Sequence, residues 1–463
     1  MADKPWRPQT LNLDKPLYIA IADALEKDIR AGLLQPGQRL PPQRDLAKMI
    51  GVNLSTLTRA FRESETRGLI SGTVGRGTYI ASDVQVPAAM SSREESDDCL
   101  LEMGLVLPLY ELDDKTAAEI GSLLQCTDLA PLLRYTEPAG SLRHRAVGSD
   151  WIGRVGLAVT PQDILVTSGS QNALACCLMS LLSSGDRLAV DAFTYPGIKT
   201  LASMLGIRLV PIETDASGMN PSALSAACRR DGVRGVFLMP EVQNPTTVSL
   251  SDERREEVAA LIKRHDLVLI EDESYGFTGR PGHFALSSLV PDHGIYIAGI
   301  SKLLGAGLRI SFTAAPPRFR GQLEKAILNT VWMASPLSAE LVSQLLISGR
   351  ANAISQAKRE EAGRRTALAL AALSPYTVFS RPAGFFLWLR LPAGWTGREF
   401  ELAARAQGVR VFCAEKFMVG NRQPFPAVRI SLTGPETIAD LSRGLAILTG
   451  ILTAGHNESE MIF

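Results

Sequence analysis

Short apolar runs of strand-forming residues alternate with helical stretches from residue 160 onward, and this alternation restricts the fold more than any other feature. The runs read ILVTS, RLAVD, VFLMP, LVLIED, IYIAG and SFTAA, and amphipathic segments such as 221–232 and 251–265 separate most of them. Runs that are apolar throughout are typical of strands buried on both faces, and helical crossovers join parallel strands. The pattern predicts an α/β domain with a largely parallel sheet covered by helices on both faces.

Polar side chains follow several of these runs directly. Ser168, Gly169, Ser170 and Gln171 come after ILVT and precede a helix expected from about residue 172, which places backbone N–H groups and hydroxyls where phosphate binds well. Alone, such a turn is also a common connector in α/β proteins. Ligands bind beyond the carboxyl ends of parallel strands, so we expect the polar residues at later strand ends to converge on one pocket. They are Asn244, Asp272, Tyr275, Lys302 and Arg309.

Charge divides the chain, although its 48 Lys and Arg balance its 48 Asp and Glu overall. Residues 1–80 hold 12 basic and 8 acidic side chains, and residues 81–98 hold 1 and 5. The stretch 81–98 lacks periodicity and is rich in Ser, Ala and acidic residues, as is typical of a flexible linker. The sequence therefore predicts a mildly basic domain over 1–80, a linker over 81–98 and the α/β domain over 99–463.

The first 80 residues have the pattern of a winged helix. Apolar residues from Leu17 to Ile29 share one helical face, a second short helix is expected over about 42–50, and Gly51 makes the turn to a third helix over about 53–67. Two short apolar stretches then flank the glycine-rich SGTVGRGT, as in a β-wing. The third helix could enter a major groove while arginines hold phosphates. From the pattern alone, a module that binds another protein is the alternative to a DNA-binding domain.

Residues 17–80 resemble the GntR-type winged helix throughout, most specifically in PGQRLPPQRDLA, GVNLSTLTRA and GRGT. The resemblance implies binding to a double-stranded DNA operator. The residues that match the family's DNA contacts are Arg44, Asn53, Ser55, Thr56, Arg76 and Gly77. The helical pattern adds Arg59, whose side chain points outward. Leu54 departs from the basic residue that is common at its place, which implies a different or weaker base readout.

The larger part of the chain, about 99–450, resembles the fold-type I pyridoxal-phosphate enzymes, specifically the class I aminotransferases. The motifs in chain order are YTEPAGSLRHR, TSGSQNAL, DAFTYPG, QNPTT, EDESY, SKLLGAGLRI and AVRIS. The resemblance implies a mostly parallel central sheet, a smaller C-terminal α+β subdomain over about 350–463, and pyridoxal 5'-phosphate as the cofactor.

The resemblance also assigns roles around the cofactor ring. Lys302 would hold the cofactor aldehyde as an aldimine, and Asp272 would keep the pyridine nitrogen protonated. Tyr275 and Asn244 would bind the phenolate oxygen, and Tyr195 would stack on the ring. Lys302, Asp272 and Tyr275 are therefore the candidate catalytic residues.

Further roles concern the phosphate and the substrate. The residues implied to hold the phosphate are Gly169, Ser170, Gln171, Ser301, Arg309 and, from the neighbouring subunit of a homodimer, Tyr135. Arg429 would grip the α-carboxylate of an amino compound. Gly299 replaces a family serine three residues before the lysine, so one phosphate contact is missing or is made by Ser301.

A GntR-type winged helix, a linker and an aminotransferase-like domain in one chain is the arrangement of the MocR subfamily of bacterial transcription regulators. This resemblance implies that the cofactor, or its product with an amino compound, is the signal that changes DNA binding. One rival is a catalytically active aminotransferase with a vestigial or autoregulatory DNA-binding domain, since no catalytic position is lost, and the sequence leaves enzymatic activity open. Another is a structural dimer that binds the cofactor.

Cysteine, histidine and hydropathy patterns indicate the cellular setting. The six cysteines form no CxxC motif and the five histidines show no ligand spacing, so we expect reduced thiols and no metal site. The apolar runs fall short of the ~20 residues that a membrane span needs, and no signal peptide opens the chain. We therefore expect a cytoplasmic protein without membrane contact.

Overall fold

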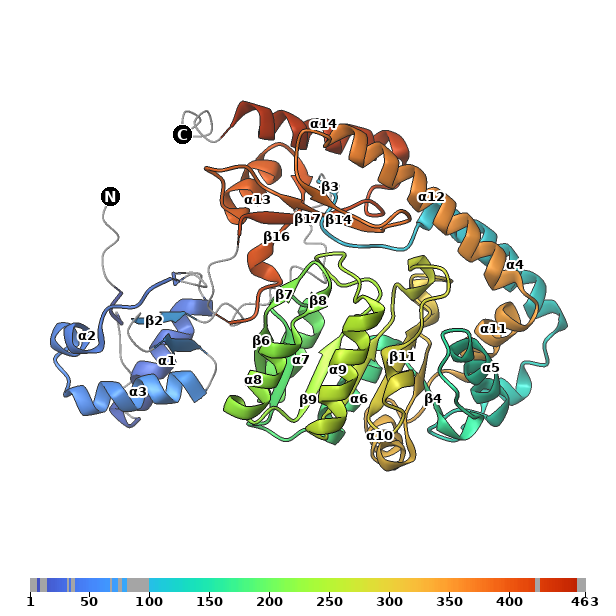
Figure 1. Ribbon diagram of the computed structural model, residues 1–463, viewed down its shortest axis with the longest axis horizontal. Helices are drawn as coiled ribbons and strands as arrows, with labels where there is room; N and C mark the ends of the chain where they lie inside the picture. The colour runs from blue at the N-terminus through green and yellow to red at the C-terminus, as the bar shows by residue number, and fades with distance from the viewer. Residues whose placement is uncertain are drawn as a thin grey trace.

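The computed structural model describes residues 6–8, 15–30, 33–34, 38–66, 69–73, 77–80, 100–420 and 425–455. The predicted linker 81–98 and the wing residue Arg76 lie outside these residues. The division of the chain into three parts therefore stays a prediction. Figure 1 shows the described elements of the winged helix in blue, beside the larger body.

The N-terminal elements form three helices and a hairpin. They are α1 (Leu17–Arg30), α2 (Gln43–Ile50), α3 (Leu54–Thr66), β1 (Ile70–Thr73) and β2 (Gly77–Ile80). Gly51 ends α2 in the left-handed conformation, at φ 70°, which suits a residue without a side chain. The apolar faces of the helices meet in one core, where Leu25, Leu46, Leu57 and Phe61 are buried. The helix-turn-helix and its hairpin are thus present as predicted.

A seven-stranded sheet forms the centre of the larger body. Its strand order is β4 (Ile164–Thr167), β12 (Ser311–Ala314), β11 (Gly294–Gly299), β10 (Val268–Asp272), β9 (Gly235–Leu238), β5 (Arg187–Asp191) and β6 (Arg208–Ile212). Only β12 runs against its neighbours within this sheet, so the predicted α/β fold with a mostly parallel sheet is confirmed. The run SFTAA becomes β12, the reversed strand. The sequence patterns did not predict β6, a partly exposed edge strand that contains Pro211.

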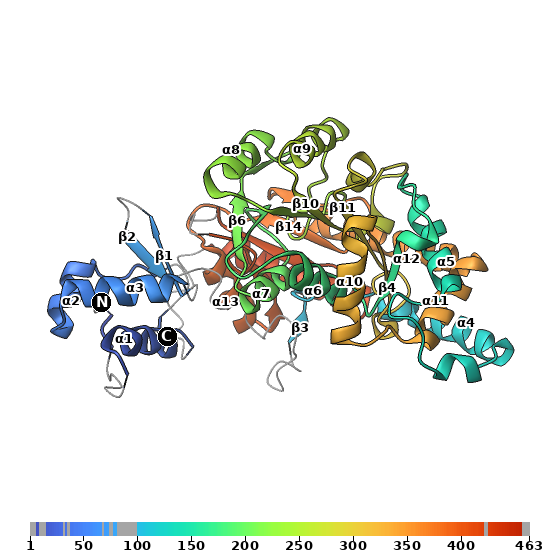
Figure 2. The ribbon, with the colours of Figure 1, turned by 90° about the horizontal axis from the view of Figure 1, so that it is seen from below.

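Helices cover both faces of the sheet (Figure 2). One face packs against α6 (Ser170–Leu181), α7 (Pro196–Met204) and α10 (Pro317–Thr330), and the other against α8 (Pro221–Asp231) and α9 (Asp252–Arg264). Helix α6 begins at Ser170, two residues before the predicted start. Beyond β4 lie α4 (Asp113–Cys126), α5 (Leu142–Gly153) and α11 (Pro336–Ile347).

The C-terminal subdomain is a second, smaller α+β layer. Helix α12 (Arg350–Ala372) leads into a four-stranded sheet, and α13 (Gly397–Ala406) and α14 (Ile438–Ala454) pack on it. The order of that sheet is β13 (Val378–Phe379), β14 (Phe386–Arg390), β17 (Ala427–Ser431) and β16 (Phe412–Cys413). Strand β3 (Leu101–Glu102), at the start of the larger body, pairs in parallel with β15 (Val409–Arg410) of the subdomain. The subdomain therefore contains residues from both ends of the larger body.

Short elements complete the described chain. They are the hairpin β7 (Thr214–Asp215) and β8 (Gly218–Met219), and the 3-10 helices Tyr110–Leu112, Ala130–Leu133, Pro161–Asp163, Gly276–Thr278, Leu286–Leu289, Ala306–Leu308 and Ala414–Lys416. Among the described residues, no helix combines the length and apolar character needed to cross a membrane. The same part of the chain contains no cluster of three or more His, Cys, Asp or Glu side chains placed to hold a metal ion.

Candidate functional site

One cavity of about 670 Å³ gathers most of the residues that the sequence predicts for a cofactor. It lies where β5, β9, β10 and β11 end. The predicted residues that line it are Ser170, Gln171, Tyr195, Asn244, Asp272, Tyr275, Lys302, Arg309 and Arg429. Leu105, Val106 and Leu107, which the sequence did not single out, form part of its wall. The expected convergence of strand ends is therefore present.

Lys302 follows β11 and points its amine into this cavity. Its Nζ donates a hydrogen bond to the carbonyl oxygen of Val106. Burial, and then the nearby charges of Arg429, Arg309 and Lys358, lower the pKa of Lys302 to about 8. A sizeable fraction of the amine is neutral near physiological pH, as a nucleophile toward a carbonyl carbon requires.

Asp272 is the last residue of β10 and is buried. Its Oδ1 accepts hydrogen bonds from the backbone N–H of Ser274 at 3.0 Å and from the Ser274 hydroxyl at 2.6 Å. Burial raises the pKa of Asp272 to about 6, while both bonds from Ser274 act in the opposite direction. The carboxyl is therefore mostly ionised at neutral pH, and it can stabilise a cation placed next to it. Ser274 is a site residue that the sequence analysis missed.

Two tyrosines supply neutral phenols. Tyr275 is buried edge-on against Phe386, with ring centroids 5.3 Å apart, and burial raises the pKa of its phenol. The hydroxyl of Tyr195 donates to Oε1 of Gln171 at 3.1 Å. Burial, and then the negative charge of Asp272, raise the pKa of Tyr195 to about 12. Both phenols keep their protons across the physiological range and can donate hydrogen bonds.

The start of α6 forms a cradle with Arg309. Gly169 has φ 83° and ψ 164°, a conformation that glycine alone adopts readily, and a Cβ there would lie 2.5 Å from Nη2 of Arg309. The guanidinium is exposed and donates to Ser301 Oγ at 3.3 Å and to the carbonyl oxygen of Ser168 at 3.4 Å. Gly169 thus allows the arginine to approach the helix N-terminus closely.

Arg309 lies before a strand, whereas the sequence analysis expected it to follow one. It precedes β12, and because β12 runs antiparallel to its neighbours, the start of β12 lies beside their carboxyl ends. The expectation that all five polar groups sit after successive strands was wrong for Arg309, although its position at the cavity was correct.

The glycine at position 299 has a structural explanation. A Cβ there would lie 2.5 Å from Ser170 Oγ and 2.9 Å from Ser274 Oγ, and these two hydroxyls are 3.3 Å apart. The space for a side chain at 299 is therefore taken by the two serines. Ser301, the predicted substitute, accepts a hydrogen bond from Arg309 instead.

Arg429 lies on β17 and is buried, 4% exposed. It donates to Asn244 Oδ1 at 2.7 Å and to the carbonyl oxygen of Gly104 at 2.7 Å, and its guanidinium lies 4.6 Å from the ring centroid of Phe417. Its Nε is buried and has no hydrogen-bond partner among the described residues. Burial lowers the pKa of Arg429 to about 10, so it remains a cation at neutral pH. A buried cation with an unused donor suits an anionic ligand.

The predicted phosphate ligand Tyr135 is placed differently from the rest. It is 82% exposed and is absent from the cavity lining. Its ring centroid lies 5.8 Å from that of Trp332, which is itself 56% exposed. Within one chain these two aromatic side chains therefore form a surface pair away from the cavity.

The winged helix places its described candidate residues on its surface. Arg44 on α2 and Ser55 on α3 are exposed, and Thr56 is half-buried. Asn53 accepts hydrogen bonds from the Ser55 backbone N–H at 3.0 Å and hydroxyl at 3.2 Å, so its side-chain oxygen helps to cap α3. Arg59 is exposed, with its guanidinium 4.3 Å from the ring centroid of Tyr18.

Two further positions of the winged helix begin secondary-structure elements. Leu54, at the first position of α3, is 40% exposed. Gly77 begins β2, and Arg76 before it lies outside the described residues. The described candidates on α2 and α3 thus share the surface of the helix-turn-helix.

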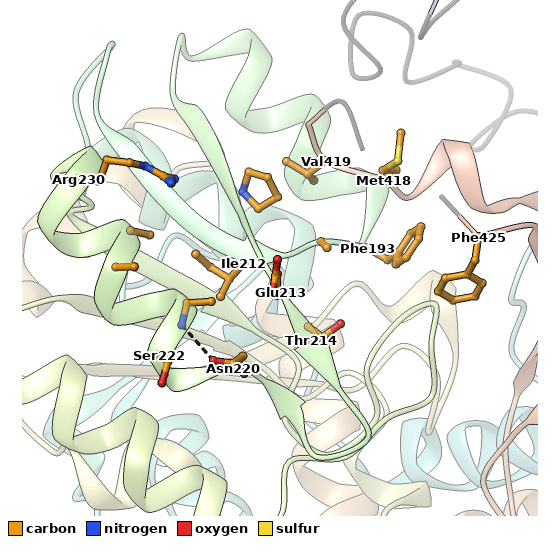
Figure 3. Close-up of a pocket in the computed structure, with 15 residues that line it drawn as sticks. Phe193, Ile212, Glu213, Thr214, Asn220, Ser222, Arg230, Met418, Val419 and Phe425 are labelled. Carbon is orange, nitrogen blue, oxygen red and sulfur yellow. Dashed lines mark hydrogen bonds between the residues drawn. The ribbon is translucent and has the colours of Figure 1, made fainter. Parts of the chain in front are cut away.

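A second hollow, of about 940 Å³, lies between β6, α8 and the segment that contains Met418 and Val419 (Figure 3). Phe193, Ile212 and Arg230 are also among its lining residues, and none of the predicted site residues contributes to it. The smaller cavity around Lys302 is nevertheless the candidate functional site, because the predicted polar residues converge on it and none of them lines the larger hollow.

Comparisons with known proteins agree with both halves. Residues 17–80 match the gntR family of bacterial regulatory proteins, and residues 114–444 match the family of class I and II aminotransferases. The chain is 37% identical over 447 residues to the HTH-type transcriptional regulator YdeF of Bacillus subtilis, with 96% of each chain covered.

One further regulator and one solved enzyme structure are also similar to the chain. The chain is 26% identical over 426 residues to PtsJ, the vitamin B6 salvage pathway transcriptional repressor of Salmonella typhimurium, covering 84% of this chain and 93% of PtsJ. Its fold is similar to that of LysN, an α-aminoadipate aminotransferase of Thermus thermophilus, with 24% identity, a TM-score of 0.68, and coverage of 85% and 98%. The chain therefore belongs to the class I and II aminotransferase family and, because that domain follows a GntR-type winged helix, it is a DNA-binding transcriptional regulator of the MocR subfamily.

Proposed function

We propose that this regulator depends on pyridoxal 5'-phosphate, which it binds covalently at Lys302, and that the cofactor or an amino compound bound to it is the effector. The observation that carries the proposal is the convergence of one amine, one ionised carboxyl, two neutral phenols and a buried arginine on a single cavity. We assign DNA binding to residues 1–80 and effector binding to 99–463, with 81–98 as the linker.

The cavity fits the cofactor at each of its functional groups. Lys302 is the amine for the aldehyde, and Asp272 is the carboxylate for a protonated ring nitrogen. Tyr275 and Asn244 line the cavity and would bind the phenolate oxygen, and Tyr195, which also lines it, would stack on the ring. When bound, pyridoxal phosphate supplies an aldehyde that captures amines and a ring that withdraws electrons.

The cradle at the start of α6 fits the phosphate. Ser170 and Gln171 at the start of α6 line the cavity together with Arg309, and Gly169, the N-cap of α6, lies close to the Arg309 guanidinium, so these four residues would hold the phosphate at a helix N-terminus. Ser301 orients Arg309 through a hydrogen bond. An exposed cation beside unpaired helical N–H groups is a suitable site for a dianion.

The effector's amino compound is inferred to carry a carboxylate. Arg429 is a buried cation with an unused Nε donor, so a bidentate anion can satisfy it. LysN, the fold relative, was solved with N-(5'-phosphopyridoxyl)-L-leucine, and PtsJ is named for vitamin B6 salvage. Both names agree with a cofactor-linked amino acid as the ligand class.

We further propose a homodimer whose cavities are completed across the interface. The exposed Tyr135 and Trp332 give each chain an aromatic surface pair, and Tyr135 would reach the partner's phosphate. A two-fold dimer would present two winged helices to the two halves of an operator.

Catalysis of amino transfer is the second candidate, because Lys302, Asp272, Tyr275 and Arg429 all line the same cavity. Conversion of many equivalents of an amino acid and a keto acid per chain would support this enzyme. A single conversion per bound cofactor would support the sensor.

The first experiment is an absorption spectrum of the purified protein with pyridoxal phosphate, before and after borohydride. We expect a visible band that the reductant removes and that fixes the cofactor to Lys302. Operator affinity is then measured at fixed salt, with and without the cofactor and amino acids. If the band never forms, the cofactor assignment fails, and if operator affinity does not change, the sensing role fails.

A further inference from the structure

A short segment at the start of the larger body contacts two of the three basic side chains that line the cavity, Lys302 and Arg429. We name residues 101–107 the strap. Its carbonyl oxygen at Gly104 accepts a hydrogen bond from Nη2 of Arg429 at 2.7 Å, and its carbonyl oxygen at Val106 accepts one from Nζ of Lys302. The two residues proposed to bind the amino compound and the cofactor are thus held by one stretch of backbone.

The first end of the strap is anchored in the C-terminal subdomain. Strand β3 pairs with β15, and the Met103 backbone N–H donates to the Arg410 carbonyl oxygen at 2.9 Å. The Met103 carbonyl accepts from the Ser431 N–H at 2.7 Å, and the Met103 side chain is fully buried in the subdomain core. This end is therefore an integral part of the subdomain.

Glu102 shapes the strap between its anchor and the cavity. Its Oε1 accepts hydrogen bonds from the backbone N–H groups of Gly104 and Leu105, both at 2.7 Å, and its Oε2 pairs with Arg410 at 3.2 Å. Glu102 is 6% exposed and Arg410 is 5% exposed. A buried carboxylate that binds two successive N–H groups fixes the local backbone, and this directs the Gly104 carbonyl at Arg429.

The second end of the strap contacts the C-terminal subdomain and the core of the seven-stranded sheet. The hydroxyl of Thr433, two residues after β17 of the subdomain, donates to the Leu107 carbonyl oxygen at 2.6 Å. Val106 is buried in the core that also contains Ile297 of β11 and Phe237 of β9. The strap is therefore bonded to the subdomain at both ends, and Val106 between them packs against the core of the seven-stranded sheet.

Ligand binding would change both hydrogen bonds that the strap makes to the cavity. If the neutral amine of Lys302 condensed with an aldehyde, a C=N bond would form and the aldehyde oxygen would leave as water with the two amine protons. The unprotonated nitrogen would then have no hydrogen to donate to Val106. A carboxylate that binds Arg429 through its free Nε and through Nη2 would compete with the Gly104 carbonyl for Nη2. The strap would then lose its contact with Lys302, and its contact with Arg429 would be weakened.

We propose that the strap positions Lys302 and Arg429, and that its release on ligand binding is the step that alters DNA binding. Residues 81–100, which directly precede the strap in the sequence, connect it to the winged helix that ends at Ile80. The inference rests on the proposed function, since it needs the cofactor to bind at Lys302. Glu102 is the positioning residue that the inference singles out.

The test compares two conservative variants of the full-length protein. Glu102→Gln weakens the clamp of the strap. Glu340→Gln is the matched control, because Glu340 is also 6% exposed and also bonds to basic side chains, Arg143 and His144, but makes no hydrogen bond to the strap within the described residues. The affinity for the DNA upstream of the protein's own gene is measured with and without pyridoxal phosphate, and the ratio of the two values is the coupling. Allosteric coupling typically amounts to about 5- to 150-fold.

We expect Glu102→Gln to reduce the coupling ratio at least about fivefold and to weaken pyridoxal phosphate binding, with Glu340→Gln within about twofold of the natural chain. Equal coupling in both variants would overturn the inference. Melting curves establish that both variants are folded.

Hydrogen exchange of the unaltered protein provides a second test that needs no variant. We expect the amides of Gly104 and Leu105 to exchange faster after pyridoxal phosphate binds. If the cofactor binds and changes DNA affinity while these amides keep their protection, the strap inference is wrong and the proposed function stands. If the visible band never forms, the proposed function fails first, and the strap inference fails with it.

Discussion

The two halves of this regulator place their cations in opposite surroundings. Arg44 and Arg59 lie in water on the surface of the winged helix, whereas Lys302 and Arg429 lie in a cavity where burial lowers their pKa values. Exposed charges act over the Debye length and are screened by salt, while buried charges depend on individual contacts. The comparison predicts that DNA binding depends on ionic strength, and that the proposed effector binding depends on pH and on single hydrogen bonds.

Removal of the amine gives the largest expected effect and tests whether the halves are separable. Lys302→Ala should abolish the reducible visible band, because no other lysine lines the cavity within the described chain. The variant should stay folded and should still bind operator DNA through its winged helix. Lys325→Ala removes an exposed lysine and should keep the band. A Lys302→Ala protein that retains the band would refute the assignment of the amine.

Gly169→Ala challenges the phosphate cradle. The conformation at φ 83° costs a non-glycine residue about 1–3 kcal/mol, and the added Cβ meets Arg309 at 2.5 Å. We expect pyridoxal phosphate affinity to fall about 30-fold, measured by absorbance titration, with operator affinity unchanged. Gly206→Ala adds a Cβ at φ 69° against Ser184, outside the cavity lining. It should lower the melting temperature without affecting the cofactor, and equal cofactor loss in both would argue against the cradle.

Arg44→Ala tests DNA binding by the winged helix. Loss of one charged contact to a phosphate should weaken operator binding about tenfold, or about 1.4 kcal/mol, at low salt. The effect should shrink as salt rises, because the contact is screened. Arg229→Ala removes an exposed charge from α8 and should leave operator affinity unchanged. An Arg44→Ala protein that loses cofactor binding as well would show that the two halves are not independent.

The pH dependence of cofactor capture is the subtlest expected effect. The neutral amine is the reactive form, so capture should be faster at higher pH. With a pKa of about 8, about a tenth of Lys302 is neutral at pH 7, half at pH 8 and nine-tenths at pH 9. The rate of band formation in rapid mixing should rise about fivefold from pH 7 to 8 and less than twofold from 8 to 9. A continued tenfold rise per pH unit would mean that burial does not lower this pKa.

Local patterns made the fold largely predictable. The three helices of the winged helix follow from apolar spacing and a glycine turn, and the strands of the large sheet follow from apolar runs. Edge strand β6 was not predicted, because it is partly exposed and contains Pro211 and so lacks a continuous apolar run. The antiparallel direction of β12 was not predicted, because side-chain patterns do not encode strand direction.

The candidate site was predictable where side chains carry the chemistry, and the roles of those residues remain predictions. Ser274 could have been found, since a serine two residues after an aspartate often bonds to that carboxylate. The contacts of Val106 and Gly104 could not be predicted, because they are made by backbone carbonyl oxygens, which every residue has. Tyr135 needs a second chain to be interpreted at all.

The pairing of β3 with β15 has a consequence for the order in which the protein is made. The side chains of Glu102 and Arg410 meet across 308 positions of sequence, whereas the buried core of the described winged helix draws only on residues between Ile21 and Ile80. At ~5–20 residues per second, synthesis separates these events by tens of seconds. The winged helix is complete while the strap has no partner strand, so a nascent or truncated chain would bind DNA without being able to respond to the proposed effector.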